Sequence, residues 1–291
     1  MLRRMPEHAA QPDRPPLLTR ALHERLRDAA RAGVAAVTCS LDLGRSTTTV
    51  AVDSGGWSRG NARFPWLDDC RDRTIYHWDG TAFAPVARFG TGLVKLVPTE
   101  WGPPTFEIDG IKMLPTAKVS PWDDAAAKVA LVRPRGRAVL DTCGGLGYFA
   151  AWCLASGARH VLSFEKNPDV LWLRRLNPWS PEGGAGDTAA LELRQGDVSE
   201  EIRELASASV DGVLHDPPRF GIAGELCAGA FYAELARVLR PGGRLFHYTG
   251  TPNRLTTGRH VPVEVAKRLK AAGFTTELKG DGVLAVRTAG R

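Results

Sequence analysis

Acidic residues follow three successive apolar runs in the second half of this 291-residue chain. Asp141 ends the first run, Glu165 the second and Asp197 the third. If these runs are parallel strands, their carboxyl ends lie along one edge of a sheet, which is where open α/β sheets bind ligands. Glu165 comes 24 residues after Asp141, a distance at which an acid can bind both hydroxyls of a ribose. The spacing therefore predicts a nucleotide-type cofactor site.

A glycine-containing loop at residues 142–147 follows the first run, and an apolar helix is expected from about Tyr148. Gly145 and Gly147 permit positive φ and a close approach of the backbone to a ligand. The amides at the start of the helix point toward whatever lies above the loop. Strand, glycine loop and helix in this order are typical of the cofactor half of a doubly wound sheet. The loop lacks the GxGxxG pattern and follows the acid Asp141, which favours a sulfonium or ammonium ligand and argues against NAD.

A rigid polar loop follows the fourth expected strand. It contains His215, Asp216, Pro217, Pro218, Arg219 and Phe220. A carboxylate and a proline-held backbone carbonyl can together aim the lone pair of an amine for an in-line displacement. His215, and His247 one strand later, are candidate general bases near neutral pH, with hydrogen-bonded structural histidines as the alternative.

Three further side chains are candidates for contacting a substrate. Arg219 is placed to hold an acidic group, or to pair with Asp216 in a structural role. Phe220 is a candidate for stacking on a planar acceptor. Tyr248 ends the fifth strand and faces the same crevice as His247.

The ordered motifs resemble those of class I S-adenosylmethionine-dependent methyltransferases over about residues 121–291. The series contains Asp141, Gly145, Gly147, Glu165, Gly196-Asp197, Asp216-Pro217-Pro218 and the turn at 239–243. The resemblance implies an α/β fold with a Rossmann-like doubly wound sheet of seven strands that ends in an antiparallel hairpin. It also implies S-adenosyl-L-methionine as the cofactor.

The same resemblance implies a role for each cofactor-binding residue. Gly145 and Gly147 would pass close to the methionine part, Glu165 would hold the ribose, and Asp197 with Val198 would hold the adenine. Cys143 stands where the family usually has its first loop glycine. The cysteine would narrow or reshape the methionine end of the pocket.

The Asp216 loop resembles the Asp/Asn-Pro-Pro-aromatic motif of enzymes that methylate amino groups of DNA, RNA and protein glutamine. Arg219 occupies the place of the aromatic residue, and Phe220 follows one position later. The resemblance implies methyl transfer to a nitrogen of an RNA base, a protein side chain or a small amine.

A second resemblance concerns the N-terminal half. A β domain followed by a strand–Asp109-Gly110–strand element and a helix is similar to the layout of spermidine/spermine synthases. Met113 stands where those enzymes carry glutamine, and the paired acids of their catalytic loop are absent after His215. An aminopropyltransferase using decarboxylated S-adenosylmethionine is therefore the alternative enzyme. A non-catalytic S-adenosylmethionine- or RNA-binding protein is the other alternative.

Three domains are expected. Residues 1–20 form a disordered tail, residues 21–118 a helix and a small antiparallel β domain, and residues 119–291 the cofactor domain. Short β-type runs are expected at 34–39, 47–52, 74–78, 83–88 and 93–97. Helices are expected at 21–32, 121–132, 202–206 and 223–239. On the 121–132 helix, Asp123, Asp124 and Lys128 could reach the cofactor site, with simple helix capping as the alternative for the two acids.

Charge and composition give less information about binding partners than the motifs do. The formal net charge is +6, and the last 52 residues hold ten Lys/Arg against three Asp/Glu. This excess is compatible with RNA or another polyanionic substrate, and equally with a solvated, arginine-rich surface. No apolar run is long enough to span a membrane, and no secretory signal precedes the first helix. Five cysteines without metal spacing predict a cytoplasmic protein without structural zinc. The β domain is a candidate RNA platform, substrate lid or homodimer surface.

Overall fold

The computed structural model describes residues 14–182, 190–218, 224–250 and 261–289. The chain divides into two compact units. The first contains the chain up to Pro121 and also Trp172–Trp179, and the second contains Trp122–Leu171 and the chain from Ser180. Nothing in the sequence pattern indicates that residues 172–179 belong with the N-terminal unit.

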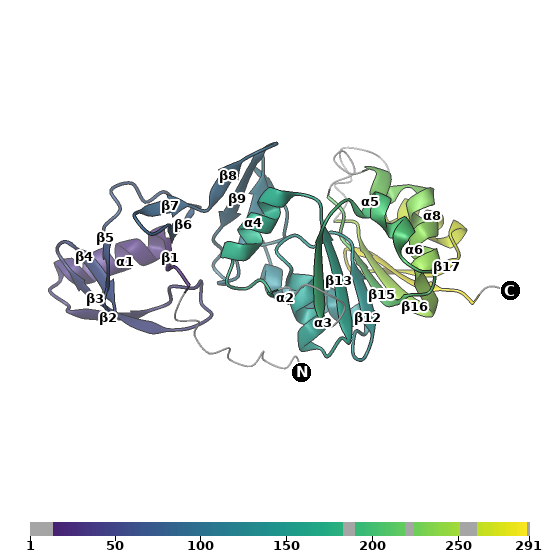
Figure 1. Cartoon of the computed structure of the whole chain (residues 1–291), viewed down its shortest axis with the longest axis horizontal. Coiled ribbons are helices and arrows are strands. Elements are labelled where there is room, and N and C mark those ends of the chain that lie inside the picture. Colours follow the sequence, from purple (N-terminus) through teal and green to yellow (C-terminus); the bar gives the residue numbers. More distant parts are fainter. Residues whose placement is uncertain (1–13, 183–189, 219–223, 251–260, 290–291) are drawn as a thin grey trace. The chain divides into compact units, whose positions relative to one another are not determined.

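Short antiparallel strands and one helix make up most of the first unit. Its elements are β1 (Leu17–Thr19), α1 (Arg20–Arg31), β2 (Ala36–Cys39), β3 (Thr48–Asp53), β4 (Gly56–Arg59), β5 (Ala62–Pro65), β6 (Ile75–Trp78), β7 (Phe83–Pro85), β8 (Ala87–Phe89), β9 (Leu93–Val97), β10 (Thr105–Ile108) and β11 (Ile111–Lys112). The strands form the sheets β1-β6-β7, β2-β3-β4-β5 and β11-β10-β9-β8 (Figure 1). Helix α1 starts after Thr19, whose hydroxyl accepts a hydrogen bond from the amide of Leu22 at 3.3 Å.

Trp57 is one of the largest fully buried side chains in the core of this unit. Its side chain is fully buried and stacks on Phe64, with ring centroids 4.3 Å apart. Leu18 and Leu26 belong to the same buried cluster. Large aromatic side chains dominate the energetics of such cores, so Trp57 of β4 and Phe64 of β5 tie these two strands to the core of the unit.

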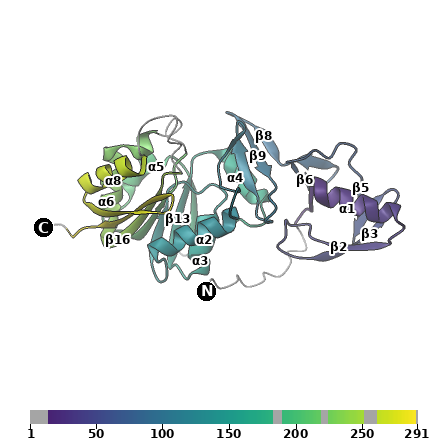
Figure 2. The ribbon, with the colours of Figure 1, turned by 180° about the vertical axis from the view of Figure 1, so that it is seen from behind.

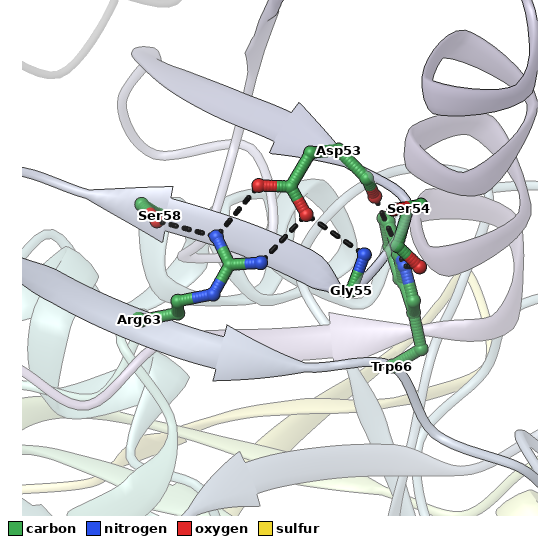
Figure 3. Close-up of polar contacts among 6 residues, drawn as sticks. All are labelled: Asp53, Ser54, Gly55, Ser58, Arg63 and Trp66. Atoms are coloured by element: carbon green, nitrogen blue, oxygen red, sulfur yellow. Dashed lines mark hydrogen bonds and ion pairs between the residues drawn. The ribbon is translucent and has the colours of Figure 1, made fainter.

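A polar cluster closes the turn between β3 and β4 (Figure 3). The Asp53 carboxylate accepts hydrogen bonds from both terminal nitrogens of Arg63, at 2.8 and 2.6 Å, and from the amide of Gly55 at 2.8 Å. The indole N–H of Trp66 donates to the carbonyls of Asp53 and Ser54. The hydrogen bonds from Arg63 are the main reason that the pKa of Asp53 is lowered to about 2.

Two expectations for this unit are wrong. Leu17–Thr19 pair with β6 and Leu18 is fully buried, so the disordered tail expected over residues 1–20 does not extend to these positions. Strands β4 and β5 were not expected at all. Their four-residue runs contain glycine, serine, arginine and proline without clear alternation of apolar and polar side chains, so the pattern carries little strand signal.

The second unit contains a sheet of seven strands in the order β14-β13-β12-β15-β16-β18-β17. The remaining elements of the chain are α2 (Pro121–Val132), β12 (Ala138–Asp141), α3 (Tyr148–Ala155), β13 (His160–Glu165), α4 (Pro168–Leu176), β14 (Leu191–Gln195), α5 (Val198–Glu201), η1 (Ile202–Glu204), β15 (Val210–His215), η2 (Gly224–Cys227), α6 (Gly229–Val238), β16 (Leu239–Tyr248), α8 (Val261–Ala271), β17 (Phe274–Lys279) and β18 (Gly282–Arg287). Strands β12 to β16 are parallel, and β18 is antiparallel to both neighbours. The predicted α/β doubly wound sheet and its terminal hairpin are confirmed.

Helices cover both faces of this sheet (Figures 1 and 2). On one face, Leu235 of α6 and Leu269 of α8 share a buried cluster with Leu140 of β12. On the other face lies α2, because a Cβ added at Gly212 of β15 would come within 3.5 Å of Val132. Because successive residues of a strand point to opposite faces of the sheet, the same strands pack against helices on both sides.

Two helices of this unit differ from the expectation. The helix expected at 202–206 begins at Val198, because the Asp197 carboxylate accepts the Ser199 amide at 2.9 Å and caps it. The helix expected at 223–239 is shorter, since α6 begins at Gly229 after the separate turn η2. The helix expected at 121–132 is confirmed as α2.

The start of β4 gives a prediction for stability. Gly56 has a φ of 155°, and a Cβ at this position would overlap the carbonyl oxygen of Phe64. We expect Gly56→Ala to lower the free energy of unfolding of the N-terminal unit by about 3 kcal/mol, because the backbone must shift around the added methyl group. Urea unfolding followed by tryptophan fluorescence measures the loss.

Gly60→Ala is the matched control. Gly60 also has positive φ, 57°, but nothing lies within 4 Å of an added Cβ. Its cost is the left-handed backbone alone, about 1 kcal/mol. If Gly56→Ala and Gly60→Ala lowered the free energy of unfolding equally, the close packing of β4 against β5 would be contradicted.

Candidate active site

The acidic strand ends predicted from the sequence lie along one edge of the seven-stranded sheet. Asp141 ends the central strand β12, opposite Ser163 of β13 and Leu214 of β15 in the parallel ladders. Asp216 directly follows β15. The chain passes from β12 to β13 on one side and to β15 only later on the other, so Asp141 and Asp216 flank the point at which the strand order reverses. Ligands of open α/β sheets bind at such a point.

Backbone hydrogen bonds fix the glycine loop after β12. The Gly144 amide donates to the carbonyl of Phe164 at 2.6 Å, and the Gly145 amide donates to the Glu165 carboxylate at 2.9 Å. Gly145 and Gly147 have positive φ, 49° and 81°, as the loop requires. The other oxygen of Glu165 accepts the amide of Asn167 at 2.9 Å. Each carboxylate oxygen can accept more than one hydrogen bond, so Glu165 can orient the loop and still accept a hydroxyl.

Burial controls the groups next to this loop. Asp141 is 1% exposed, and one of its carboxylate oxygens accepts the Ser163 hydroxyl at 2.9 Å. Cys143 packs against the apolar cluster of the sheet. Burial, followed by the charge of Glu165, raises the pKa of the Cys143 thiol well above its usual value. Cys143 is therefore a neutral thiol at the loop and has no nucleophilic character near neutral pH.

Asp197 stands at the end of the third parallel strand. One of its carboxylate oxygens caps α5, and the other pairs with the ammonium of Lys166 at 2.6 Å. Burial alone would raise the pKa of Asp197, but hydrogen bonds from Lys166 and Ser199 outweigh it and leave the pKa lowered. Val198, the neighbouring predicted contact, is 4% exposed. Asp197 and Val198 thus offer an ionised hydrogen-bond acceptor beside an apolar surface.

Asp216 differs from the other acids because its pKa lies near neutrality. Burial raises the pKa of Asp216 to about 7, although the nearby ammonium of Lys128 acts to lower it. Pro217 and Pro218 follow directly and are half-buried. Arg219 and Phe220, the predicted substrate contacts, lie outside the described residues. The described part of the loop therefore presents a carboxyl group and proline-held backbone.

Both histidines at the strand ends are buried and fully hydrogen-bonded. The Nε2–H of His215 donates to the carbonyl of Leu226 at 3.0 Å, and its Nδ1 accepts the Thr142 hydroxyl at 2.7 Å. The Nδ1–H of His247 donates to the carbonyl of Tyr248 at 2.8 Å, and its Nε2 accepts the phenol of Tyr232 at 2.9 Å. Carbonyl oxygens only accept, so these partners define the tautomers.

The electrostatics of the two rings agree with this geometry. Burial, followed by the charge of His247, lowers the pKa of His215 well below its usual value. Burial lowers the pKa of His247 to about 4. The ring centroids lie 4.3 Å apart in an edge-to-face arrangement. Of the two roles that the sequence left open, the arrangement favours hydrogen-bonded structural histidines over general bases.

A charged cluster next to Asp216 was only partly anticipated. The ammonium of Lys128 lies 2.7 Å from the Asp124 carboxylate, 4.0 Å from the Asp281 carboxylate and 3.7 Å from the ring centroid of Tyr248. The sequence suggested Asp123, Asp124 and Lys128 on α2, of which Asp124 and Lys128 belong to the cluster, and it placed Tyr248 at a strand end. Asp281 lies in the turn between β17 and β18 and was not among the predicted site residues. Its role depends on how the hairpin folds back, for which no local sequence signal exists.

No group of three or more His, Cys, Asp or Glu side chains within the described residues is arranged to hold a metal ion. None of the helices described there is long and apolar enough to cross a membrane.

The sheet topology and the arrangement of its strand ends define the fold of class I S-adenosylmethionine-type transferases. A spermidine synthase solved with the transition-state analogue AdoDATO has the same fold, with a TM-score of 0.54 at 16% identity over 70% of this chain and 73% of that chain. The predicted spermidine-synthase-like layout is confirmed.

Sequence comparison identifies the family. The chain is 42% identical over 213 residues, 72% of each protein, to "Uncharacterized protein MJ1233" of Methanocaldococcus jannaschii, and it belongs to the same family. It is also 33% identical over 135 residues to polyamine aminopropyltransferase 2 of Streptomyces coelicolor, a match that spans 44% of this chain and only 24% of that protein. No protein-family model matches the sequence.

The buried histidine pair gives a prediction for the pH dependence of stability. The unfolded state protonates His247 near its usual pKa of 6.5, whereas the folded state keeps it neutral down to its lowered pKa of about 4. Between these values the unfolded state binds the extra proton, so His247 removes about 1.4 kcal/mol of stability for each pH unit of acidification. His247→Gln lacks this contribution, and its disadvantage relative to the wild type should shrink as the pH falls.

Urea unfolding of both chains at pH 7.5 and pH 5.5 measures the effect. The raised pKa of Asp216 acts in the opposite direction over an overlapping range. The difference between the two chains isolates the histidine, whereas the wild-type profile alone does not. If the free energy of unfolding of the wild type and of His247→Gln changed equally between the two pH values, His247 would not be held neutral by burial.

Proposed function

We propose that this protein is an S-adenosylmethionine-dependent methyltransferase that acts on a nitrogen atom. The observation that carries the proposal is the position of the Asp216-Pro217-Pro218 segment, directly beside the strand-order reversal and next to Asp141. This is where an acceptor would lie against a cofactor held by the neighbouring strand ends. The chemical nature of the acceptor remains an RNA base, a protein side chain or a small amine.

The residues present fit the cofactor. The positive φ of Gly145 and Gly147 allows the backbone of the loop to lie close to the methionine part of the cofactor. Glu165 supplies oxygens for the ribose, and Asp197 supplies an ionised acceptor for the adenine beside the apolar surface of Val198. Asp141 supplies a negative charge, which suits the cationic groups of the cofactor. When bound, the cofactor supplies an electrophilic methyl group.

The chain itself positions the acceptor nitrogen. The Asp216 carboxylate and the carbonyl held by Pro217 can accept the two hydrogens of an amino group, which aims the lone pair along the direction of transfer. Such positioning supplies a large part of the rate in displacement reactions. With a pKa of about 7, the Asp216 carboxyl can also take up a proton near neutral pH.

Aminopropyl transfer is the competing enzyme class. The partial match to a polyamine aminopropyltransferase is consistent with the shared layout. Only Asp216 stands in the described part of the loop after β15, and two prolines follow it instead of a second acid. A single carboxyl group at this position favours methyl transfer.

Binding of the two cofactors distinguishes the classes. Isothermal calorimetry should show tighter binding of S-adenosylmethionine than of its decarboxylated form. Asp141→Asn preserves the shape of the side chain and removes its charge, so we expect the affinity for S-adenosylmethionine to fall about tenfold or more. Preference for the decarboxylated cofactor would favour aminopropyl transfer, and binding of neither would overturn the cofactor assignment.

Asp211→Asn is the matched control. Asp211 lies near the start of β15, where its carboxylate accepts the Ala138 amide at 2.9 Å and pairs with Arg240 at 2.6 Å. These contacts stand at the opposite end of the sheet from Asp141. We expect the variant to lose some stability and to bind the cofactor with wild-type affinity.

Asp216 gives a separate prediction for binding as a function of pH. A cationic ligand binds more tightly to the ionised carboxylate, so the affinity for S-adenosylmethionine should rise as the pH increases through the Asp216 pKa of about 7. The gain is at most about tenfold per pH unit. Asp216→Asn should lack this component. The α-amino group of the cofactor titrates at about pH 8, so Asp216→Asn measures the part of the pH dependence that comes from the cofactor itself. If the affinity of the wild type and of Asp216→Asn changed equally with pH, Asp216 would not be the titrating group.

A further inference from the structure

The ammonium of Lys128 occupies a site made for an alkylammonium group. The side chain is 4% exposed, and its nitrogen lies 3.7 Å from the ring centroid of Tyr248. The carboxylate of Asp124 is 2.7 Å away and that of Asp281 is 4.0 Å away. An aromatic face and carboxylates are the groups by which proteins recognise ammonium ions.

This cluster is more than a helical ion pair. Its groups come from three places in the fold: Asp124 and Lys128 from α2, Tyr248 from the end of β16, and Asp281 from the turn between β17 and β18. The turn is tied to the strand end because the carbonyl of Asp281 accepts both the amide and the hydroxyl of Thr249, at 3.1 and 3.0 Å. A buried lysine is costly unless paired, and the fold provides the pairing from separate elements.

The cluster also lies beside the acceptor loop. His215 of β15 pairs with His247 of β16, so Asp216 and Tyr248 follow at the same level on adjacent strands. Lys128 lowers the pKa of Asp216, although burial is the larger influence and raises it, and Asp124, Asp141 and Asp281 raise it as well. Lys128 is thus a cation that acts on Asp216. Any acceptor bound at Asp216 lies near a positive charge that belongs to the protein.

We propose that Lys128 is a specificity-determining residue that fills an alkylammonium subsite beside Asp216 and thereby excludes polyamines and other cationic aliphatic amines as acceptors. The inference rests on the proposed function and narrows its substrate class to uncharged nitrogen, such as an amide or the amino group of a base. A second ammonium would be repelled by Lys128 and would find the carboxylates and the ring already engaged. An uncharged amino group has no such repulsion and carries the lone pair that transfer requires.

Lys128→Ala tests the subsite directly. The substitution removes three carbons and the ammonium, and n-propylamine restores the same atoms. We expect Lys128→Ala to bind n-propylammonium at least about tenfold more tightly than the wild type, measured by calorimetry and by the rise in melting temperature. Putrescine should likewise stabilise Lys128→Ala and leave the wild type unchanged.

Lys128→Met is the matched control. Methionine fills most of the space with an uncharged chain, so this variant should bind neither amine more tightly than the wild type. Equal amine affinities in the alanine and methionine variants would overturn the proposal, as would binding of putrescine by the wild type. A Lys128→Ala chain that does not fold alone should fold in n-propylammonium chloride and not in sodium chloride at the same concentration. Failure to fold in both salts would also contradict the proposal.

The result is independent of the cofactor. Amine binding is measured without S-adenosylmethionine, whereas the proposed function depends on calorimetry with the cofactor and the unmodified chain. If Lys128→Ala bound n-propylammonium but the wild type did not bind S-adenosylmethionine, the ammonium subsite would stand and the proposed methyltransferase activity would not. Cofactor binding without amine rescue would leave the methyltransferase and remove the role of Lys128.

Discussion

The end of strand β12 is held to the end of β15 by a buried, uncharged hydrogen-bond chain, and the candidate site depends on it. The hydroxyl of Thr142 binds His215, and its amide binds the carbonyl of Leu214 at 3.1 Å. The neighbouring ring of His247 extends the buried cluster to Tyr232 on α6. Polar groups this deep are stable only when every partner is present. The acids at the sheet edge are therefore positioned by neutral side chains beneath them.

The positions of the acids could be predicted from sequence because topology alone determines them. A residue at the carboxyl end of a parallel strand reaches the ligand edge whatever its side chain, so Asp141, Glu165 and Asp197 needed no tertiary information. The same rule placed His215 and His247 at that edge and did not reveal their roles. Burial and the identity of the second partner decide whether a histidine titrates near neutral pH, and both are properties of the folded protein.

Other features depend on contacts between distant segments. The short strands β4 and β5 are stabilised by Trp57 and Phe64 in a shared aromatic core, and their own sequences favour strands only weakly. The ammonium site around Lys128 joins a helix, a strand end and a hairpin turn. No single stretch of sequence contains it, although a lysine on a mostly apolar helix, four residues after an aspartate, is a local signal that it is paired.

The assignment of Trp172–Trp179 to the first unit has a consequence for how the chain can be divided and made. No single proteolytic cut separates the two units, because cleavage after Pro121 leaves these eight residues on the wrong fragment. Trp179 donates its indole N–H to the carbonyl of Leu43 at 3.1 Å, and Trp172 packs edge-on against His77. A ribosome must therefore translate β12 and β13 of the second unit before the first has all of its residues.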